Sequence, residues 1–164
     1  RAGFATVTSP GRLERVNTKA HSTASGVTTF IDATHNPHGA NALAHALTHD
    51  FNFTRLVGVL GILGDKDARG IMEALEPVLA EVVITQNSSP RASDAYDLAE
   101  IAREIFGDER VHVDDNLASA YALAAELAEA PLEEVGVQSG AGVIITGSVV
   151  TAGEARALFG KDPQ

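Results

Sequence analysis

The chain has 164 residues, 45% of them hydrophobic, and a formal net charge of −10. This length suits one domain with a single core. An acidic surface repels nucleic acid and anionic membranes, so neither is expected as a partner. No apolar run reaches the roughly 18 residues of a membrane span, and no signal peptide is visible. Cysteine is absent, which excludes disulfides and thiolate metal sites. We therefore expect a cytoplasmic protein, and the start at Arg1 reads as a piece cut from a longer chain.

Short β-branched runs alternate with Ala- and Leu-rich amphipathic stretches along most of the chain. Strands are expected at residues 27–32, 55–63, 81–85, 111–113 and 142–146. Helices are expected at residues 37–50, 67–79, 94–106, 116–130 and 151–159. The run at 55–63 is apolar almost throughout, which indicates a strand covered on both faces. This alternation predicts an α/β fold, a Rossmann-like open and mainly parallel sheet flanked by helices on both faces.

Three segments fall outside the alternation. Residues 4–8 and 13–16 are typical of short strands around Ser9-Pro10-Gly11, and residues 17–26 are polar and typical of a mobile turn. Residues 132–141 are expected to form an irregular connection. Because the length of the chain suits one core, residues 1–164 are expected to be a single domain.

Ligands of an open α/β sheet bind outside the carboxyl ends of its strands. The loop after the first strand offers Asp32, which suits a ribose diol or an arginine partner, and His35 beside the start of a helix. Carboxylates and phosphates are favoured at such a helix N-terminus, and a histidine there can donate to them. The alternative is that Asp32 and Asn36 only satisfy backbone donors at the turn.

Two further strand ends carry candidate groups. Asp65, Lys66 and Asp67 could position a substrate amine or carboxylate, although Asp67 also suits a helix N-cap and Lys66 a solvated charge. Ser148 follows Gly147, and small residues at a strand end let a ligand approach backbone amides. The sequence lacks the second glycine of a nucleophile elbow, which argues against a hydrolase triad.

Metal and phosphate signatures are absent from the sequence. His45 and His49 stand four apart and could share a metal, but no glutamate lies between them as a zinc protease requires. We therefore expect no metal site in this chain. Neither a GxxxxGK[ST] phosphate loop nor a GxGxxG after the first strand occurs.

Four motifs resemble the successive signatures of the folylpolyglutamate synthase and dihydrofolate synthase family. They are Ser9-Pro10-Gly11-Arg12-Leu13-Glu14, Ile31-Asp32-Ala33-Thr34-His35-Asn36-Pro37, the run 58–64 followed by Asp65-Lys66-Asp67, and Ile145-Thr146-Gly147-Ser148. Their order and spacing match the C-terminal domain of that family from end to end. Thr34 replaces the family's usual alanine, and Val149 stands where an aromatic residue is common.

The resemblance implies a domain of the Mur ligase superfamily. In that family ATP phosphorylates a carboxylate of folate or dihydropteroate, and the amine of L-glutamate attacks the acyl phosphate. An N-terminal ATPase domain carries the phosphate loop and the Mg²⁺ ligands, so this chain should lack ligase activity by itself. The resemblance therefore implies that ATP, L-glutamate, the folate substrate and that ATPase domain are its partners.

The resemblance also implies residue roles. Arg12 and Asp32 would contact ATP, and His35 would act as the catalytic residue while also lining the glutamate site. Ser148 would bind glutamate, and the same role would fall to Asp65, Lys66 and Asp67.

Two other functions remain open. One is a Mur-type ligase that joins an amino acid to a peptidoglycan precursor. The other is a non-catalytic α/β nucleotide-sensing module, which the pair Asp114 and Asp115 suggests, although no strand-end lysine completes a phospho-acceptor set. A sensing module should bind its ligand tightly without further domains, whereas a ligase domain should bind weakly.

Overall fold

The computed structural model describes residues 12–16, 27–135 and 140–160. The strands are β1 (Glu14–Val16), β2 (Val27–Ile31), β3 (Arg55–Leu60), β4 (Glu81–Ile84), β5 (Val111–Val113) and β6 (Ala141–Thr146). The α-helices are α2 (Pro37–His49), α3 (Ala68–Leu75), α4 (Ala95–Phe106), α5 (Leu117–Val135) and α6 (Val149–Leu158). Two short 3₁₀ helices, η1 (Glu76–Val78) and η2 (Asp108–Arg110), precede β4 and β5. From β2 onward, strands and α-helices alternate as the sequence predicts.

The strands form one sheet in the order β1-β2-β6-β3-β4-β5. Among the described strands, β2 to β6 run parallel and β1 alone pairs antiparallel, at the edge beside β2. The last strand inserts between β2 and β3, so that Ile145 lies opposite both Ile31 and Val59. The carboxyl ends of β2, β6 and β3 therefore lie side by side, which confirms the predicted open, mainly parallel sheet.

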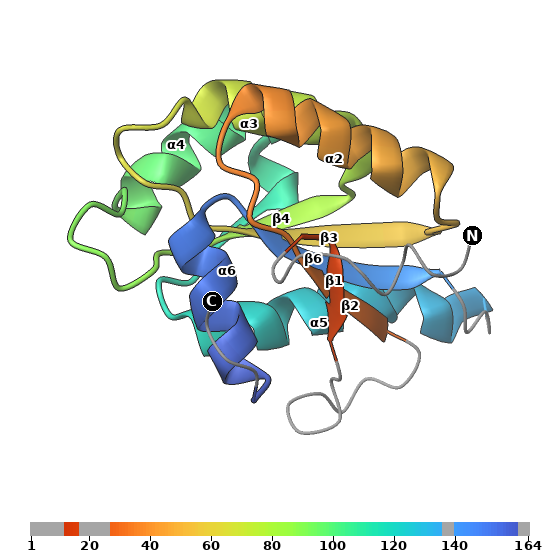
Figure 1. The fold of residues 1–164 in the computed structure, drawn as a ribbon. Helices are drawn as coiled ribbons and strands as arrows, with labels where there is room; N and C mark the ends of the chain where they lie inside the picture. Colours follow the sequence, from red (N-terminus) through yellow and green to blue (C-terminus); the bar gives the residue numbers. More distant parts are fainter. Residues whose placement is uncertain (1–11, 17–26, 136–139, 161–164) are drawn as a thin grey trace.

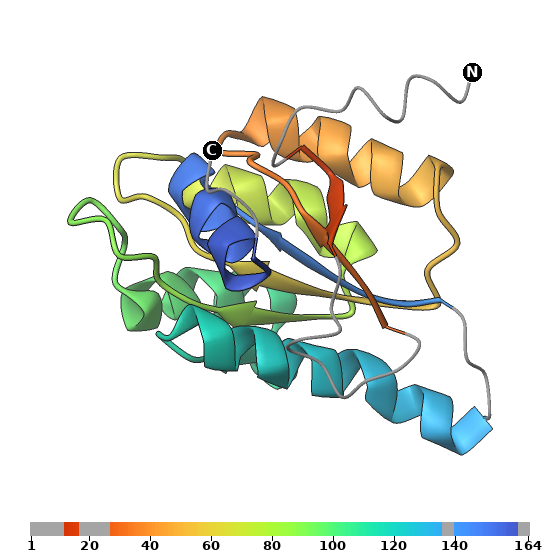
Figure 2. The same cartoon turned by 60° about the horizontal axis from the view of Figure 1, so that its bottom comes forward.

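Helices cover both faces of the sheet (Figures 1 and 2). Helices α2, α3 and α4 pack on one face, and α5 and α6 pack on the other. Strand β3 divides its side chains between the two layers: Leu56 and Leu60 join the first core, and Val57 and Val59 join the second. Burial of both faces explains why this strand reads as a nearly continuous apolar run.

Several element boundaries differ from the sequence prediction. Helix α3 ends at Leu75 and continues as η1, because Pro77 has no N–H group to extend the helical hydrogen bonds. Strand β3 ends at Leu60, and α6 begins at Val149, two residues before the predicted start. Helix α5 extends to Val135, into the segment expected to be irregular. The predicted strand at 4–8 and the turn at 17–26 lie outside the described residues.

Charged groups gather at the amino ends of β3, β4 and β5. Arg55 forms an ion pair with Glu81, and Glu81 also accepts a hydrogen bond from His112 Nε2 at 2.6 Å. Burial, and then the nearby Arg55 guanidinium, lower the pKa of His112 below its ordinary value. None of the described helices is long and apolar enough to cross a membrane.

Candidate functional site

The loop after β2 is organised around the carboxylate of Asp32. Its Oδ2 accepts a hydrogen bond from the backbone N–H of Leu13 at 2.9 Å. Its Oδ1 accepts from the N–H of Thr34 at 2.8 Å and from the Thr34 hydroxyl at 2.5 Å. The Asp32 N–H extends the parallel ladder by donating to Ile145 O at 3.0 Å. The carboxylate is therefore fixed at the end of the strand, and it ties the edge segment at Leu13 to the sheet.

His35 and Asn36 complete the loop and begin helix α2. Asn36 Oδ1 accepts from Gly39 N at 2.7 Å as the N-cap, and Pro37 occupies the first turn, as the sequence predicts. His35 Nδ1 lies 3.1 Å from the carbonyl oxygen of Ala33. Because a carbonyl only accepts, Nδ1 carries the proton, and in the neutral ring Nε2 is then an acceptor.

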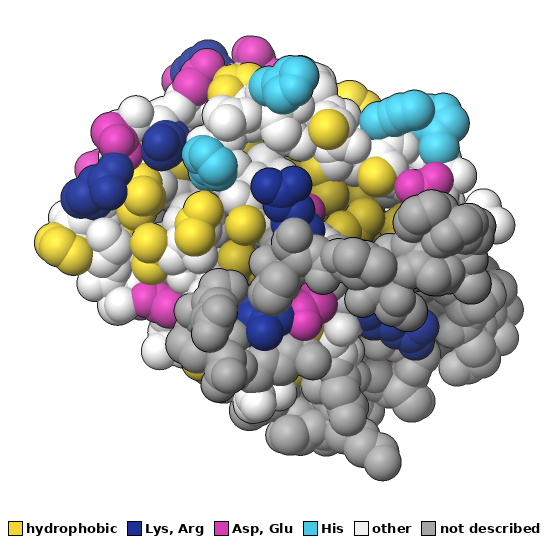
Figure 3. Space-filling view, in the orientation of Figure 1, with side chains coloured by type: hydrophobic (Ala, Val, Ile, Leu, Met, Phe, Trp, Pro, Cys, Tyr) yellow, Lys and Arg dark blue, Asp and Glu magenta, His cyan; other side chains and the backbone are white. Residues whose placement is uncertain are grey.

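These residues line one open pocket of about 500 Å³. It brings together the edge segment before β1, the end of β2, the first turns of α2 and the start of α6. The polar lining includes Arg12, Asp32 and His35, and the apolar lining includes Leu43 and Val149. Figure 3 shows a hollow below α2 where basic and acidic side chains adjoin hydrophobic ones. The structure thus places both residues predicted to contact ATP beside the predicted catalytic histidine.

Ser148 lies next to this pocket, but its side chain is fully buried. Its Oγ caps helix α6 by accepting hydrogen bonds from Val150 N at 2.9 Å and Thr151 N at 3.1 Å. The following residue, Val149, is 57% exposed and reaches the pocket instead. A glutamate-binding role for Ser148 stays a prediction, and the hydroxyl already serves the helix N-terminus.

Asp65, Lys66 and Asp67 lie on the same edge of the sheet but not in this pocket. Lys66 and Asp67 line a separate hollow of about 290 Å³ between the loops that follow β3 and β4. Asp67 Oδ1 accepts from Gly70 N at 2.9 Å and is the N-cap of α3. Asp65 pairs with Arg91 at 2.7 Å, and the hydrogen-bonded guanidinium holds the pKa of Asp65 below its usual value. The structure therefore supports the capping alternative for Asp67 and leaves a glutamate role for all three untested.

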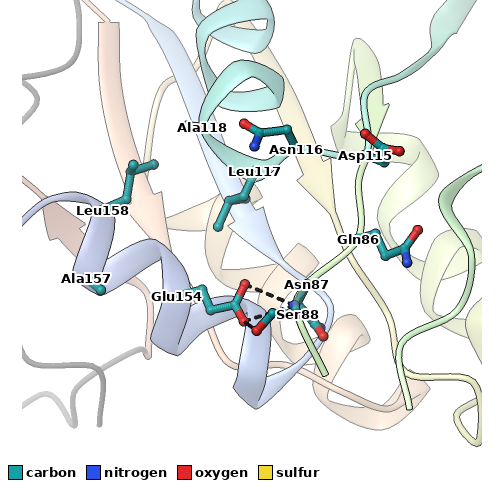
Figure 4. Close-up of a pocket in the computed structure, with 10 residues that line it drawn as sticks. All are labelled: Gln86, Asn87, Ser88, Asp115, Asn116, Leu117, Ala118, Glu154, Ala157 and Leu158. Atoms are coloured by element: carbon teal, nitrogen blue, oxygen red, sulfur yellow. Dashed lines mark hydrogen bonds between the residues drawn. The ribbon is translucent and has the colours of Figure 1, made fainter. Parts of the chain in front are cut away.

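A further hollow of about 560 Å³ opens at the ends of β4 and β5 (Figure 4). The backbone N–H and hydroxyl of Ser88 both donate to the carboxylate of Glu154 on α6. The opposite wall carries Asp115 and Asn116 at the start of α5. The loops that follow β4 and β5 line this hollow through Gln86, Asn87, Asp115 and Asn116. Glu154 is absent from the predicted site residues, because nothing in the helical pattern of α6 marks it.

Metal-ligating side chains do not cluster in the described part of the chain. Within residues 12–16, 27–135 and 140–160, no group of three or more His, Asp or Glu side chains is placed to hold a metal ion. His45 and His49 lie together on the exposed side of α2, with their Nδ1 atoms 3.4 Å apart.

An open parallel sheet with a polar pocket at the carboxyl ends of its strands defines an α/β ligand-binding domain. The sequence matches the family described as "Mur ligase, glutamate ligase domain" over residues 11–149, and the chain belongs to that family.

Within the family, the chain is 54% identical over its whole length to the dihydrofolate synthase/folylpolyglutamate synthase of Mycobacterium tuberculosis, of which it covers 33%. A solved structure of Mycobacterium tuberculosis folylpolyglutamate synthase complexed with ADP superposes with a TM-score of 0.88 at 54% identity, covering 99% of this chain and 35% of that one. The chain is also 39% identical to the UDP-N-acetylmuramoyl-L-alanyl-D-glutamate–2,6-diaminopimelate ligase of Parasynechococcus marenigrum, over 52% of this chain and 17% of that protein. The chain thus spans about a third of the length of its folylpolyglutamate synthase relative.

Proposed function

We propose that this domain is the C-terminal part of an ATP-dependent ligase that adds L-glutamate to folates. The activity is that of a tetrahydrofolylpolyglutamate synthase, with dihydrofolate synthesis from dihydropteroate as a second reaction. The 54% identity to the Mycobacterium tuberculosis relative over the whole chain supports this substrate class. The observation that carries the proposal is the meeting of Arg12, Asp32 and His35 in one pocket at the carboxyl edge.

The reaction requires anions to be held close together. ATP transfers its γ-phosphoryl group to the terminal carboxylate of the folate, which gives an acyl phosphate and ADP. A guanidinium and a helix N-terminus are the groups that stabilise such charge, and Arg12 and the start of α2 supply both at the pocket. Asp32 accepts three protein hydrogen bonds, and a carboxylate has room for a fourth from a ribose hydroxyl.

The role proposed for His35 is to accept a proton from the amine of glutamate. The ammonium of glutamate must give up a proton before its nitrogen can attack the acyl carbon and displace phosphate. The Nε2 lone pair of a neutral His35 is an acceptor for that proton, because Nδ1 already donates to Ala33 O. Ser148, Asp65, Lys66 and Asp67 remain proposed glutamate-binding residues. The ammonium of Lys66 suits a substrate carboxylate, and the carboxylates of Asp65 and Asp67 suit the substrate amine.

The remaining two thirds of the ligase would supply what this chain does not. We propose that the ATPase domain supplies the Mg²⁺ ligands and the phosphate loop. Closure of that domain over the open pocket would keep water from the acyl phosphate. We propose the cytoplasm as the compartment.

A hybrid ligase tests the proposal. This chain would replace the matching third of the Mycobacterium tuberculosis relative, and ATP-dependent extension of a folate by L-glutamate would be measured. The account predicts activity for the hybrid and none for this chain alone. A folded hybrid that binds ATP but does not extend folate would contradict the proposal.

The match to a diaminopimelate-adding ligase keeps a peptidoglycan function as the second candidate. Amino-acid competition separates the two in the same assay. L-Glutamate should be incorporated and meso-diaminopimelate should neither react nor compete, whereas the reverse pattern would favour the second candidate. Tight nucleotide binding by this chain alone would instead favour a sensing module.

A further inference from the structure

Arg12 reaches the pocket from the segment just before β1, a short strand that pairs with β2. Among the described residues, strand β1 has three residues and pairs with β2 alone, and so short a pairing has little intrinsic stability. Arg12 itself is exposed. A guanidinium that must meet a phosphate needs its backbone held in place, because small misplacements of a binding group cost large factors in rate.

The backbone between Arg12 and β1 adopts a conformation that an ordinary residue avoids. Leu13 has φ of 46°, in the left-handed region, although it carries a Cβ atom. Such a conformation persists only where the surroundings determine it. Two contacts hold Leu13: its N–H donates to Asp32 Oδ2, and its side chain packs against the core layer beneath α2.

The next residue, Glu14, forms an ion pair with Arg156 on helix α6. The two residues are 142 positions apart, and their side chains are only 20% and 10% exposed. Burying two charges contributes little net stability, because the desolvation cost offsets much of the attraction. The better-attested use of such a pair is to select one arrangement of the elements that it joins.

The Glu14–Arg156 ion pair joins β1 to α6, and both elements adjoin the pocket. Strand β1 continues from Arg12 and Leu13, and helix α6 begins with Val149, and all three residues line the cavity. We infer that Glu14 and Arg156 are positioning residues for Arg12. They fix β1 against α6, which holds Leu13 in its left-handed conformation and keeps the Arg12 guanidinium over the pocket. This inference rests on the proposed function, in which Arg12 contacts ATP.

Amide hydrogen exchange, measured on this chain alone, tests whether Glu14 and Arg156 hold the backbone at Leu13. Glu14→Gln keeps the shape of the side chain but removes its charge. It should speed exchange of the Leu13 amide at least about tenfold, since local opening becomes easier. Glu81→Gln removes an ion pair of similar burial between β3 and β4, away from β1, and should leave the Leu13 amide unchanged. Unchanged exchange in Glu14→Gln would overturn the inference whatever the protein's function.

Steady-state kinetics of the hybrid ligase test whether the Glu14–Arg156 ion pair positions Arg12 for ATP. Glu14→Gln should raise the KM for ATP about ten- to a hundredfold with a smaller change in kcat. Arg156→Lys, which keeps the charge, should raise it less. In an Arg12→Ala background, Glu14→Gln should add nothing, because the positioned group is gone.

Additive increases in that double variant would show that Glu14 acts independently of Arg12 and would overturn the inference. If Arg12→Ala alone leaves the KM for ATP unchanged, the proposed ATP contact is wrong. The exchange result then still decides whether Glu14 and Arg156 hold the segment.

Discussion

Replacing Asp32 with alanine should destabilise this domain as well as weaken the ATP contact proposed for it. The change removes an acceptor of three hydrogen bonds and leaves the N–H groups of Leu13 and Thr34 without that partner. Net contributions of hydrogen bonds to charged groups are about 1.5–3 kcal/mol each. Two of the three bonds come from one residue and the loop is half-exposed, so water replaces part of the loss. We therefore expect Asp32→Ala to lower the free energy of unfolding by about 2 kcal/mol.

Urea titration of this chain, followed by circular dichroism, measures the effect. With a slope of about 2 kcal/mol per molar urea, the midpoint should fall by about 1 M. Asp115→Ala is the matched control, because Asp115 is an exposed carboxylate at another strand end. An Asp32→Ala midpoint equal to that of wild type, or to that of Asp115→Ala, would refute the view that this carboxylate organises the loop.

Three further predictions concern single residues. Gly147→Ala should cost about 3 kcal/mol or more, because φ is 115° and the new Cβ would lie 2.7 Å from the Gly61 carbonyl oxygen. Gly107→Ala, where φ is 88°, ψ is 152° and the space is open, should cost less, about 2 kcal/mol, for the backbone conformation alone. The difference between the urea midpoints of the two variants then measures the cost of the crowding at Gly147. Ser148→Ala should lower stability by about 1–2 kcal/mol, since it removes the cap of α6; a thermal midpoint equal to wild type would contradict this. Because burial lowers the pKa of His112, the unfolded chain binds this proton more readily. Stability should therefore decline as pH falls below about 6.5, and titrations at several pH values should show a shallower decline in His112→Gln.

The sequence predicts the fold well where local chemistry and burial agree. Asn36 and Pro37 mark the start of α2 by their own side chains, and the apolar run of β3 reflects burial on both faces. The prediction is wrong at two helix boundaries that the spacing of apolar residues does not mark. Helix α5 passes Pro131, where the sequence suggests a stop, and α6 begins early because Ser148 caps it.

The sequence likewise predicts some features of the candidate site and not others. Asp32 and His35 can be found from the rule that ligands bind at strand ends, and they share one pocket with Arg12. The long-range contacts around this pocket and the neighbouring hollow cannot be found from that rule. The bond from Leu13 to Asp32 spans 19 positions, and the contact between Ser88 and Glu154 spans 66. These contacts join residues that are far apart in the sequence. They depend on the order of the strands in the sheet, which the local spacing of apolar residues does not reveal.

The central claim is that one pocket serves ATP through Asp32 and glutamate through His35. Steady-state kinetics of the hybrid ligase with both substrates varied test it most directly, with His45→Ala on the exposed side of α2 as the control. The account predicts that Asp32→Ala mainly raises the KM for ATP, that His35→Ala mainly impairs the use of glutamate, and that His45→Ala changes neither. Equal kinetics for all three variants and the unmodified hybrid would contradict it.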